Sequence, residues 1–129
     1  MRKLNPPIPK AVNNWVKVIN GPNVTPDQMA NLYSQSAVLL ATFSSFLKGH
    51  KEIKGYFVDF LDKKNLTCSI LKNDTKILNP ATSTEIANGI YVFSFWNENN
   101  QREMVIARYT YVCRKGKIIT HHSSLNPEK

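Results

Sequence analysis

The change of hydrophobic period near residue 64 limits the fold of this chain more than any other feature of its sequence. Before that point apolar residues recur at helical spacing, and after it they alternate with polar residues over long runs. Helices followed by consecutive strands are typical of an α+β domain whose helices cover one face of the sheet. We therefore expect an α+β fold with N-terminal helices packed on a curved, mostly antiparallel sheet.

Three helices are predicted in the first half of the chain. The first starts at Lys10 and ends before Gly21-Pro22, which stops the helical pattern. A short second helix starts at Thr25-Pro26 and runs through Tyr33, because threonine is a good N-cap and proline suits the first turn. The third spans residues 51–63 and has one aromatic and aliphatic face opposite a charged face.

Five strands are predicted, one between the second and third helices and four in a late meander. Asparagine, proline and glycine residues mark the turns, among them Asn73-Asp74 within the second predicted strand. The late strands exceed the usual length of roughly five or six residues, and long strands twist and curl. Helices that close such a sheet leave a cone with a natural pocket. The predicted strands span residues 37–43, 66–78, 84–96, 103–114 and 117–124.

The chain of 129 residues fits one domain, which we place at residues 10–129 behind an extended, proline-rich arm at residues 1–9. No apolar run reaches the roughly 18 residues that span a bilayer. The first ten residues lack the apolar segment of a signal peptide. We therefore expect a cytoplasmic protein without membrane contact.

A net charge of +8 raises the hypothesis of nucleic-acid binding. The basic residues are scattered over residues 48–64 and the turn at 114–117, and no stripe alternates them with exposed aromatic residues. Single-strand-binding surfaces need such a stripe. The charge therefore predicts a solvated basic surface, and nucleic acid is not an expected partner.

His121 and His122 are the first candidates for chemistry. Adjacent residues of a strand point to opposite faces, so the pair cannot hold one metal ion without a bulge, and we expect neither a metal nor a cofactor. Whichever histidine faces the cone could transfer a proton near neutral pH. In the alternative interpretation both are structural and form hydrogen bonds with Ser123 and Ser124. The sequence leaves open which histidine faces inward.

Arg108 is the candidate for binding an anion. It lies between apolar residues in the middle of a strand, and a buried arginine needs a carboxylate partner. That partner is either a side chain of the chain itself or the anionic group of a ligand. No acidic residue occupies the centre of an apolar strand, where burial would make it a useful base. The other candidate ligand-binding residues carry a hydroxyl group and are Tyr33, Tyr56, Tyr91, Tyr109, Thr110 and Ser123.

Three stretches, together with the order of elements, resemble the nuclear transport factor 2-like superfamily. They are residues 37–42 (AVLLAT), 49–57, and 107–112 (ARYTYV) with 118–127. More narrowly, they are similar to SnoaL-like and SgcJ/EcaC-type proteins, relatives of the calcium/calmodulin-dependent protein kinase II association domain. The resemblance implies a cystatin-like cone and a homodimer formed through the sheet. It also favours Arg108 as a pocket residue, since arginines line the pocket of the kinase association domain.

The resemblance does not imply one reaction, because members of this superfamily include isomerases, dehydratases, cyclases and proteins without catalytic activity. Our first hypothesis is a pocket protein that binds a small anionic or oxygenated apolar molecule. The alternative is a lyase or isomerase that uses His121 or His122 for proton transfer. An oligomerisation module is a second alternative. The sequence does not decide whether the protein is an enzyme.

Overall fold

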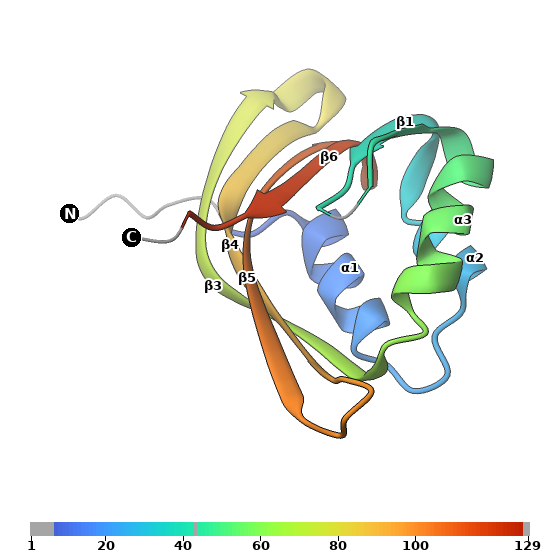
Figure 1. Ribbon diagram of the computed structural model, residues 1–129. Helices are drawn as coiled ribbons and strands as arrows, with labels where there is room; N and C mark the ends of the chain where they lie inside the picture. Colours follow the sequence, from blue (N-terminus) through green and yellow to red (C-terminus); the bar gives the residue numbers. More distant parts are fainter. Residues whose placement is uncertain (1–6, 43, 128–129) are drawn as a thin grey trace.

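A curved six-stranded sheet wraps around the helices in the computed structural model, which describes residues 7–42 and 44–127 (Figure 1). The helices lie on the concave side of the sheet. The helical elements are α1 (Lys10–Ile19), α2 (Pro26–Ala30), α3 (Gly49–Phe60) and a 3₁₀ turn η1 (Pro80–Thr82). The strands are β1 (Tyr33–Leu40), β2 (Phe46–Lys48), β3 (Lys64–Asn79), β4 (Thr84–Trp96), β5 (Arg102–Arg114) and β6 (Lys117–Leu125). None of the helices in the described ranges is both long and apolar enough to cross a membrane.

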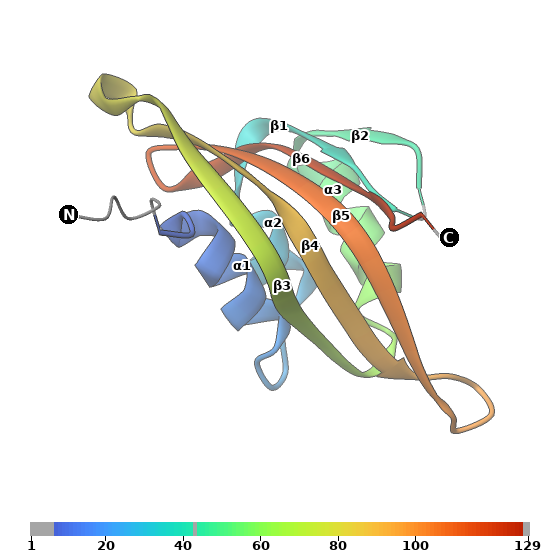
Figure 2. The same cartoon turned by 90° about the vertical axis from the view of Figure 1, so that its left-hand side faces the viewer.

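The strand order β2-β1-β6-β5-β4-β3 explains how the cone closes. Strands β3 to β6 form the predicted antiparallel meander, whose long strands run diagonally across Figure 2. Strand β1 pairs in parallel with β6, so the first strand of the chain lies beside the last. This pairing brings the end of β1 next to His121 and its neighbours.

The two N-terminal helices form for the reasons that the sequence suggests. Helix α1 buries its apolar side, with Trp15 at its centre. Thr25 and Gln28 form a reciprocal capping box at the start of α2, because each side chain accepts a hydrogen bond from the other residue's backbone N–H. The helix ends at Ala30 rather than at the predicted Tyr33, since Tyr33 already belongs to β1.

Several predicted boundaries were wrong. Strand β1 starts at Tyr33 rather than at residue 37, and α3 spans Gly49–Phe60 rather than 51–63. Strand β2 was not predicted, because its three residues are too few to show an alternating pattern. Asn73-Asp74 does not break β3, which accommodates extra residues through bulges in its pairing with β4. Phe43 at the end of the first predicted strand, and residues 1–6 of the predicted arm, lie outside the described residues.

Aromatic side chains fill most of the concave side. The ring of Trp15 lies 6.0 Å from the ring centroids of both Tyr91 and Tyr111. Gly89 leaves room for Tyr109 to cross β4, because a Cβ at residue 89 would lie 2.5 Å from the Tyr109 hydroxyl oxygen. The interior of the cone is therefore close-packed, and the open space within it is small.

Candidate functional site

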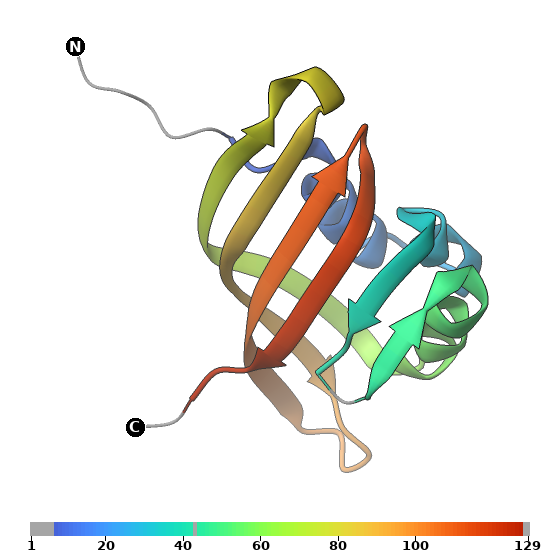
Figure 3. The same ribbon diagram turned by 90° about the horizontal axis from the view of Figure 1, so that it is seen from above.

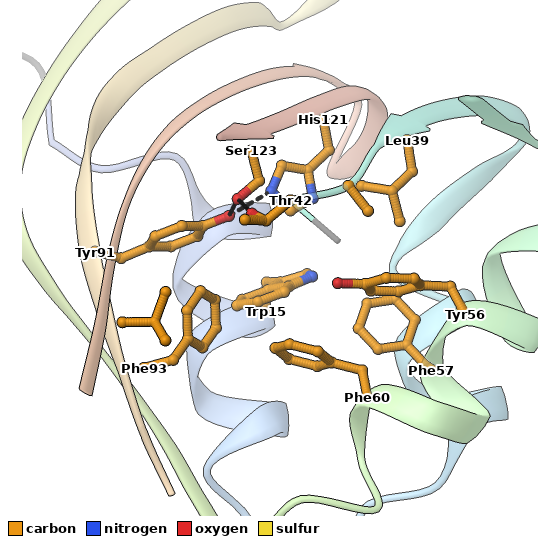
Figure 4. A pocket seen from close by; sticks show the side chains of 12 residues that line it. Trp15, Leu39, Thr42, Tyr56, Phe57, Phe60, Tyr91, Phe93, His121 and Ser123 are labelled. Carbon is orange, nitrogen blue, oxygen red and sulfur yellow. Dashed lines mark hydrogen bonds between the residues drawn. The ribbon is translucent and has the colours of Figure 1, made fainter. Parts of the chain in front are cut away.

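A small cavity lies between α1, α3, the end of β1 and the inner face of the sheet (Figure 4). We call it the inner cavity. The space open to the centre of a water molecule is about 20 Å³, which is room for roughly one water molecule. Its apolar lining includes Trp15, Leu39, Phe57, Phe60, Phe93 and Val105, and its polar lining consists of Thr42, Tyr56, Tyr91, His121 and Ser123.

His121 stands at the centre of a buried chain of hydrogen bonds. The indole Nε1–H of Trp15 donates to the Tyr33 hydroxyl at 3.0 Å, and that hydroxyl lies 2.8 Å from His121 Nδ1. The other ring nitrogen, Nε2, lies 3.1 Å from the Tyr91 hydroxyl. Both ring nitrogens of His121 are therefore occupied by tyrosine hydroxyls.

The chain continues to the wall of the inner cavity and has one consistent direction. Tyr91 donates its only hydroxyl proton to Ser123 Oγ at 2.6 Å, and Ser123 Oγ lies 2.5 Å from Thr42 Oγ1. Because the Tyr91 proton is used, His121 Nε2–H must donate to the Tyr91 oxygen. His121 Nδ1 then accepts from Tyr33, whose oxygen accepts from Trp15. The geometry thus selects the Nε2–H tautomer.

The side chains of this hydrogen-bonded chain are neutral at physiological pH. Burial, and secondarily the proximity of His122, lowers the pKa of His121 to about 3. Burial also raises the pKa of the Tyr33 and Tyr91 hydroxyls well above the usual value. These groups therefore keep fixed protonation states near pH 7, and no ring nitrogen of His121 is free to accept a proton from a ligand.

Tyr56 supplies the one polar group of the inner cavity that lacks a partner. It comes from α3, and its hydroxyl points into the cavity in Figure 4. That hydroxyl forms no hydrogen bond with any residue in the described ranges. Burial raises the Tyr56 pKa to about 12, so the group remains a neutral hydroxyl that can donate or accept a hydrogen bond.

The predicted site residues separate into two groups on opposite faces of the sheet. His121, Ser123, Tyr91 and Tyr56 line the inner cavity. Tyr33 does not line the inner cavity, and its hydroxyl contacts His121 Nδ1. Arg108, Thr110 and His122 lie on the outer face, along an open groove of about 740 Å³. Tyr109 belongs to the inner face, but its hydroxyl donates to Asn73 Oδ1 at 2.7 Å, away from the cavity.

The expectation that Arg108 is buried was wrong. Its side chain is exposed, opposite Ser124 of β6. The apolar neighbour that suggested burial, Ile106, is itself 44% exposed on the same outer face. Arg108 therefore does not share a cavity with His121, and water can solvate its charge.

Sequence reasoning predicted Tyr56 of α3 as a site residue but missed Thr42, Phe57 and Phe60. Thr42 lies within the apolar run 37–43, which has the pattern of a buried strand, and Phe57 and Phe60 follow the spacing of an ordinary buried helix face. The only signal for Thr42 is its hydroxyl group within that apolar run.

Neither a metal nor a reactive thiol is indicated in the described ranges. They contain no group of three or more histidine, cysteine, aspartate or glutamate residues that could hold a metal ion. Cys68 and Cys113 are buried on the inner face, and burial raises the pKa of each to about 12. Both therefore remain thiols at neutral pH.

Comparison with solved structures shows the class of fold. A candidate dehydratase of the nuclear transport factor 2-like family from Streptomyces avermitilis aligns with a TM-score of 0.76 at 9% identity, over 92% of this chain and 93% of that chain. A Mycobacterium tuberculosis protein in complex with estradiol-17β-hemisuccinate aligns with a TM-score of 0.69 at 16% identity, over 90% and 91%. The chain has the nuclear transport factor 2-like fold, a cystatin-like α+β cone, as predicted.

A third structure is more similar in sequence. It is a candidate calcium/calmodulin-dependent protein kinase II association domain from Xanthomonas campestris. It aligns with a TM-score of 0.81 at 28% identity, over 100% of this chain and 99% of that chain. No family model matches the chain, and no curated protein matches it. The comparisons thus give a fold that is shared by ligand-binding, isomerase, dehydratase and cyclase-type proteins, without a specific function.

Proposed function

We propose that this protein binds a small, mainly apolar molecule with an oxygen atom in the inner cavity. The observation that carries the proposal is the Tyr56 hydroxyl, which points into an aromatic cavity and has no partner. This hydroxyl has a free donor and a free acceptor position towards the cavity, and an oxygen of a ligand would give it a hydrogen-bond partner there. The Thr42 and Ser123 hydroxyls offer a second polar contact in the same cavity.

A neutral oxygen fits this cavity better than an anion. No lysine or arginine lines it among the described residues, and His121 is neutral because burial lowers its pKa to about 3. A carboxylate taken into such surroundings would lose its hydration without gaining a counter-ion. Ketones, alcohols and phenols are therefore the favoured ligand class, and the anionic alternative loses its support with the exposed Arg108.

Binding without turnover suits His121 better than acid–base catalysis. A general base works best when its pKa lies near the working pH, and burial lowers that of His121 to about 3. Both ring nitrogens are also engaged by tyrosine hydroxyls. A lyase or isomerase that used His121 would first have to break one of these bonds. We therefore assign His121 to holding the polar wall of the cavity in place.

A pair of matched compounds tests the proposal. 4-Ethylphenol and ethylbenzene differ only in one hydroxyl, and calorimetric titration measures the Kd of each. We expect 4-ethylphenol to bind with a Kd of about 0.1 to 1 mM, which is ordinary for a ligand of this size. Tyr56→Phe should weaken 4-ethylphenol about fivefold to tenfold, the cost of one hydrogen bond, and leave ethylbenzene unchanged.

Two results would contradict the proposal. The first is that the wild-type protein binds neither compound. The second is that Tyr56→Phe changes the affinity for both compounds equally, which would show that the hydroxyl recognises nothing. Val58→Ala is a matched control, because Val58 is exposed on α3 and does not line the inner cavity.

We also propose that the protein forms a homodimer through the outer face of the sheet. Met104 is 62% exposed and Ile106 is 44% exposed on this face of β5, where an isolated sheet would present apolar side chains to water. The similarity to a candidate association domain supports the same conclusion. Arg108 and His122 would then lie at or beside the contact between the two copies.

A further inference from the structure

A surface groove lies directly outside the inner cavity. It has a volume of about 430 Å³ and is lined by residues of α3 together with Ser44 and Leu47. Strand β2, which carries Leu47, runs beside α3 in Figure 3. We call this surface groove the α3 groove. Tyr56 and Phe60 line both the α3 groove and the inner cavity, so these two side chains form the partition between them.

Tyr56 can move more easily than Phe60. Its ring stacks on the Phe60 ring at 5.5 Å between centroids, and its side chain is only partly buried. Rotation of Tyr56 breaks no hydrogen bond with a described residue, and it gives up the ring contacts with Phe60 and Phe57, each worth about 1 kcal/mol. Phe60, in contrast, is 7% exposed and contacts a third ring, that of Phe93, besides Phe57 and Tyr56. Opening therefore needs only the Tyr56 side chain to turn outward.

Neither the backbone nor the packing of α3 explains why residue 55 is a glycine, but its position in the α3 groove does. Glycine in a helix costs about 1 kcal/mol relative to alanine. Gly55 has no positive φ, and a Cβ added there would meet no atom within 4 Å. Neither helix geometry nor close packing therefore requires a glycine. It lines the α3 groove beside Tyr56, where the missing side chain leaves the passage to the partition open.

The charges that line the α3 groove reverse the balance of the whole chain. The protein has 17 lysine and arginine residues against 9 acidic residues. Among the described residues that line the groove, Glu52 and Asp59 are acidic and Lys63 is basic, and the Lys63 ammonium lies 4.5 Å from the centroid of the Phe95 ring. Such a groove favours a cationic end of a ligand over an anionic one.

We propose that the α3 groove is the entrance and the outer half of the ligand site, and that Tyr56 is the side chain that closes it. The proposal rests on ligand binding in the inner cavity. The inner cavity holds roughly one water molecule, so a ligand enters only when the partition opens. Because the inner cavity alone is this small, the apolar body fits only in the space that the Tyr56 ring leaves between the inner cavity and the α3 groove, and an amine at the other end lies near Glu52 and Asp59. The ligand class is an amine with an aromatic or apolar body and a neutral oxygen.

Three compounds that differ at one end test the chemical class. Tyramine, 4-ethylphenol and 3-(4-hydroxyphenyl)propanoate share the phenol and carry an ammonium, no charge and a carboxylate, respectively. We expect tyramine to bind about threefold to tenfold more tightly than 4-ethylphenol, and the carboxylate to bind most weakly. The double variant Glu52→Gln/Asp59→Asn should reduce tyramine to the affinity of 4-ethylphenol and leave the neutral compound unchanged.

Filling the groove tests the entrance. Gly55→Trp should weaken or slow the binding of all three compounds at least about tenfold while the far-ultraviolet circular dichroism stays as in wild type, because the new side chain points into open space. Gly55→Ala is the matched control and should bind within about twofold of wild type. Ser44→Trp fills the groove from the opposite wall and replaces Gly55→Trp if that variant does not fold.

The outcomes separate the two proposals. If the wild-type protein binds none of the three compounds, both ligand binding and the entrance are overturned. If 4-ethylphenol binds and the groove-filling variants bind it as wild type does, the entrance is wrong and ligand binding stands. If the carboxylate binds as tightly as tyramine, the assignment of an amine to the outer half is wrong.

Discussion

At the scale of single residues, the fully buried polar side chains of the inner face have hydrogen-bond partners among the described residues, with one exception. The chain from Trp15 to Thr42 gives each hydroxyl, indole and imidazole group a partner. Tyr111 is the exception, because its hydroxyl is buried without a partner among the described residues. Its ring stacks on His121 at 4.0 Å between centroids. The ring therefore contributes packing, while the hydroxyl contributes a desolvation cost.

Removing the Tyr111 hydroxyl and removing the Tyr91 hydroxyl should have opposite effects on the free energy of unfolding. Tyr111→Phe keeps the stacked ring and removes an unsatisfied group, so we expect the free energy of unfolding to rise by about 1 kcal/mol. Tyr91→Phe removes a hydroxyl that bonds both His121 and Ser123, so we expect a loss of about 1 to 3 kcal/mol. Urea denaturation measures both. A loss of stability in Tyr111→Phe would contradict this assignment.

His121 should make the fold sensitive to mild acid. Burial lowers its pKa from 6.5 to about 3, so the unfolded chain takes up this proton more readily than the folded protein does. Stability from this group is complete above about pH 6.5 and falls as the pH falls towards 3. We expect a loss of about 2 kcal/mol at pH 5 relative to pH 7.

The control for this pH dependence is His121→Gln, which removes the titrating group. That variant should be less stable at pH 7, yet its stability should change little between pH 7 and 5. An equally steep dependence in the variant would show that other groups cause it. Nitrogen-15 shifts of the imidazole should also show a neutral ring with the proton on Nε2 down to about pH 4.

At the scale of elements, α3 positions the site more than any other segment. One side of the helix buries Ile53 and Phe57 in the core, and Tyr56 at its edge reaches both the inner cavity and the α3 groove. Strand β6 places His121 and Ser123 on the opposite wall, and its parallel pairing with β1 brings Thr42 to Ser123. The site therefore depends on one helix and on two strands far apart in sequence.

Two glycines of α3 should respond oppositely to alanine. Gly49 starts the helix with φ of +84°, which a side chain strains, so Gly49→Ala should destabilise the fold by about 1 kcal/mol or more. Gly55 has open space and ordinary backbone, so Gly55→Ala should stabilise it by about 0.5 to 1 kcal/mol. Thermal unfolding distinguishes them. Similar shifts in both variants would contradict the role given to Gly49.

At the scale of the whole molecule, the curved sheet has two different faces. The sheet curves around α1 (Figures 1 and 2). Its concave face is filled with aromatic side chains, and its convex face exposes apolar residues of β5 to water. A second copy on the convex face would cover these residues without closing the α3 groove, which lies on the helical side of the molecule. Dimer formation and ligand binding are thus expected to be separable.

A single substitution should separate the dimer from the ligand site. Light scattering coupled to size exclusion should give twice the mass of the 14.7 kDa chain for wild type. Ile106→Glu should give the monomer mass, because it places a charge within the apolar contact, and should keep the affinity for 4-ethylphenol within about twofold. Leu78→Glu changes an exposed residue at the end of β3 and serves as a control. A monomeric wild type would contradict the dimer.

The sequence predicted the elements whose alternating pattern extends over many residues. It missed those whose limits are set by tertiary contacts. The alternation from residue 84 onward is sustained, so the predicted bounds of β4, β5 and β6 lie within one residue of those in the structure. Strand β2 and the start of β1 depend on pairing with distant strands, which leaves no local pattern. The extent of α2 likewise depends on where β1 begins.

The candidate site was predicted only in part, because the sequence did not show which face of the sheet each strand residue occupies. Alternation correctly divided His121 from His122, but it could not say which one faces inward, because a bulge between β5 and β6 sets the phase. For Arg108 the phase was misjudged, since β5 carries apolar residues on both faces and each face looked like core. Ala107 is buried, whereas Ile106 is exposed beside Arg108.

The claim that a ligand occupies the inner cavity is tested most directly by isotope-filtered nuclear Overhauser contacts between 4-ethylphenol and labelled methyl groups. The account predicts contacts from the compound to the methyl groups of Leu39 and Val105, which line the inner cavity. Contacts only to Met104 or Leu71, both exposed to solvent, would place the compound on the surface and contradict the account.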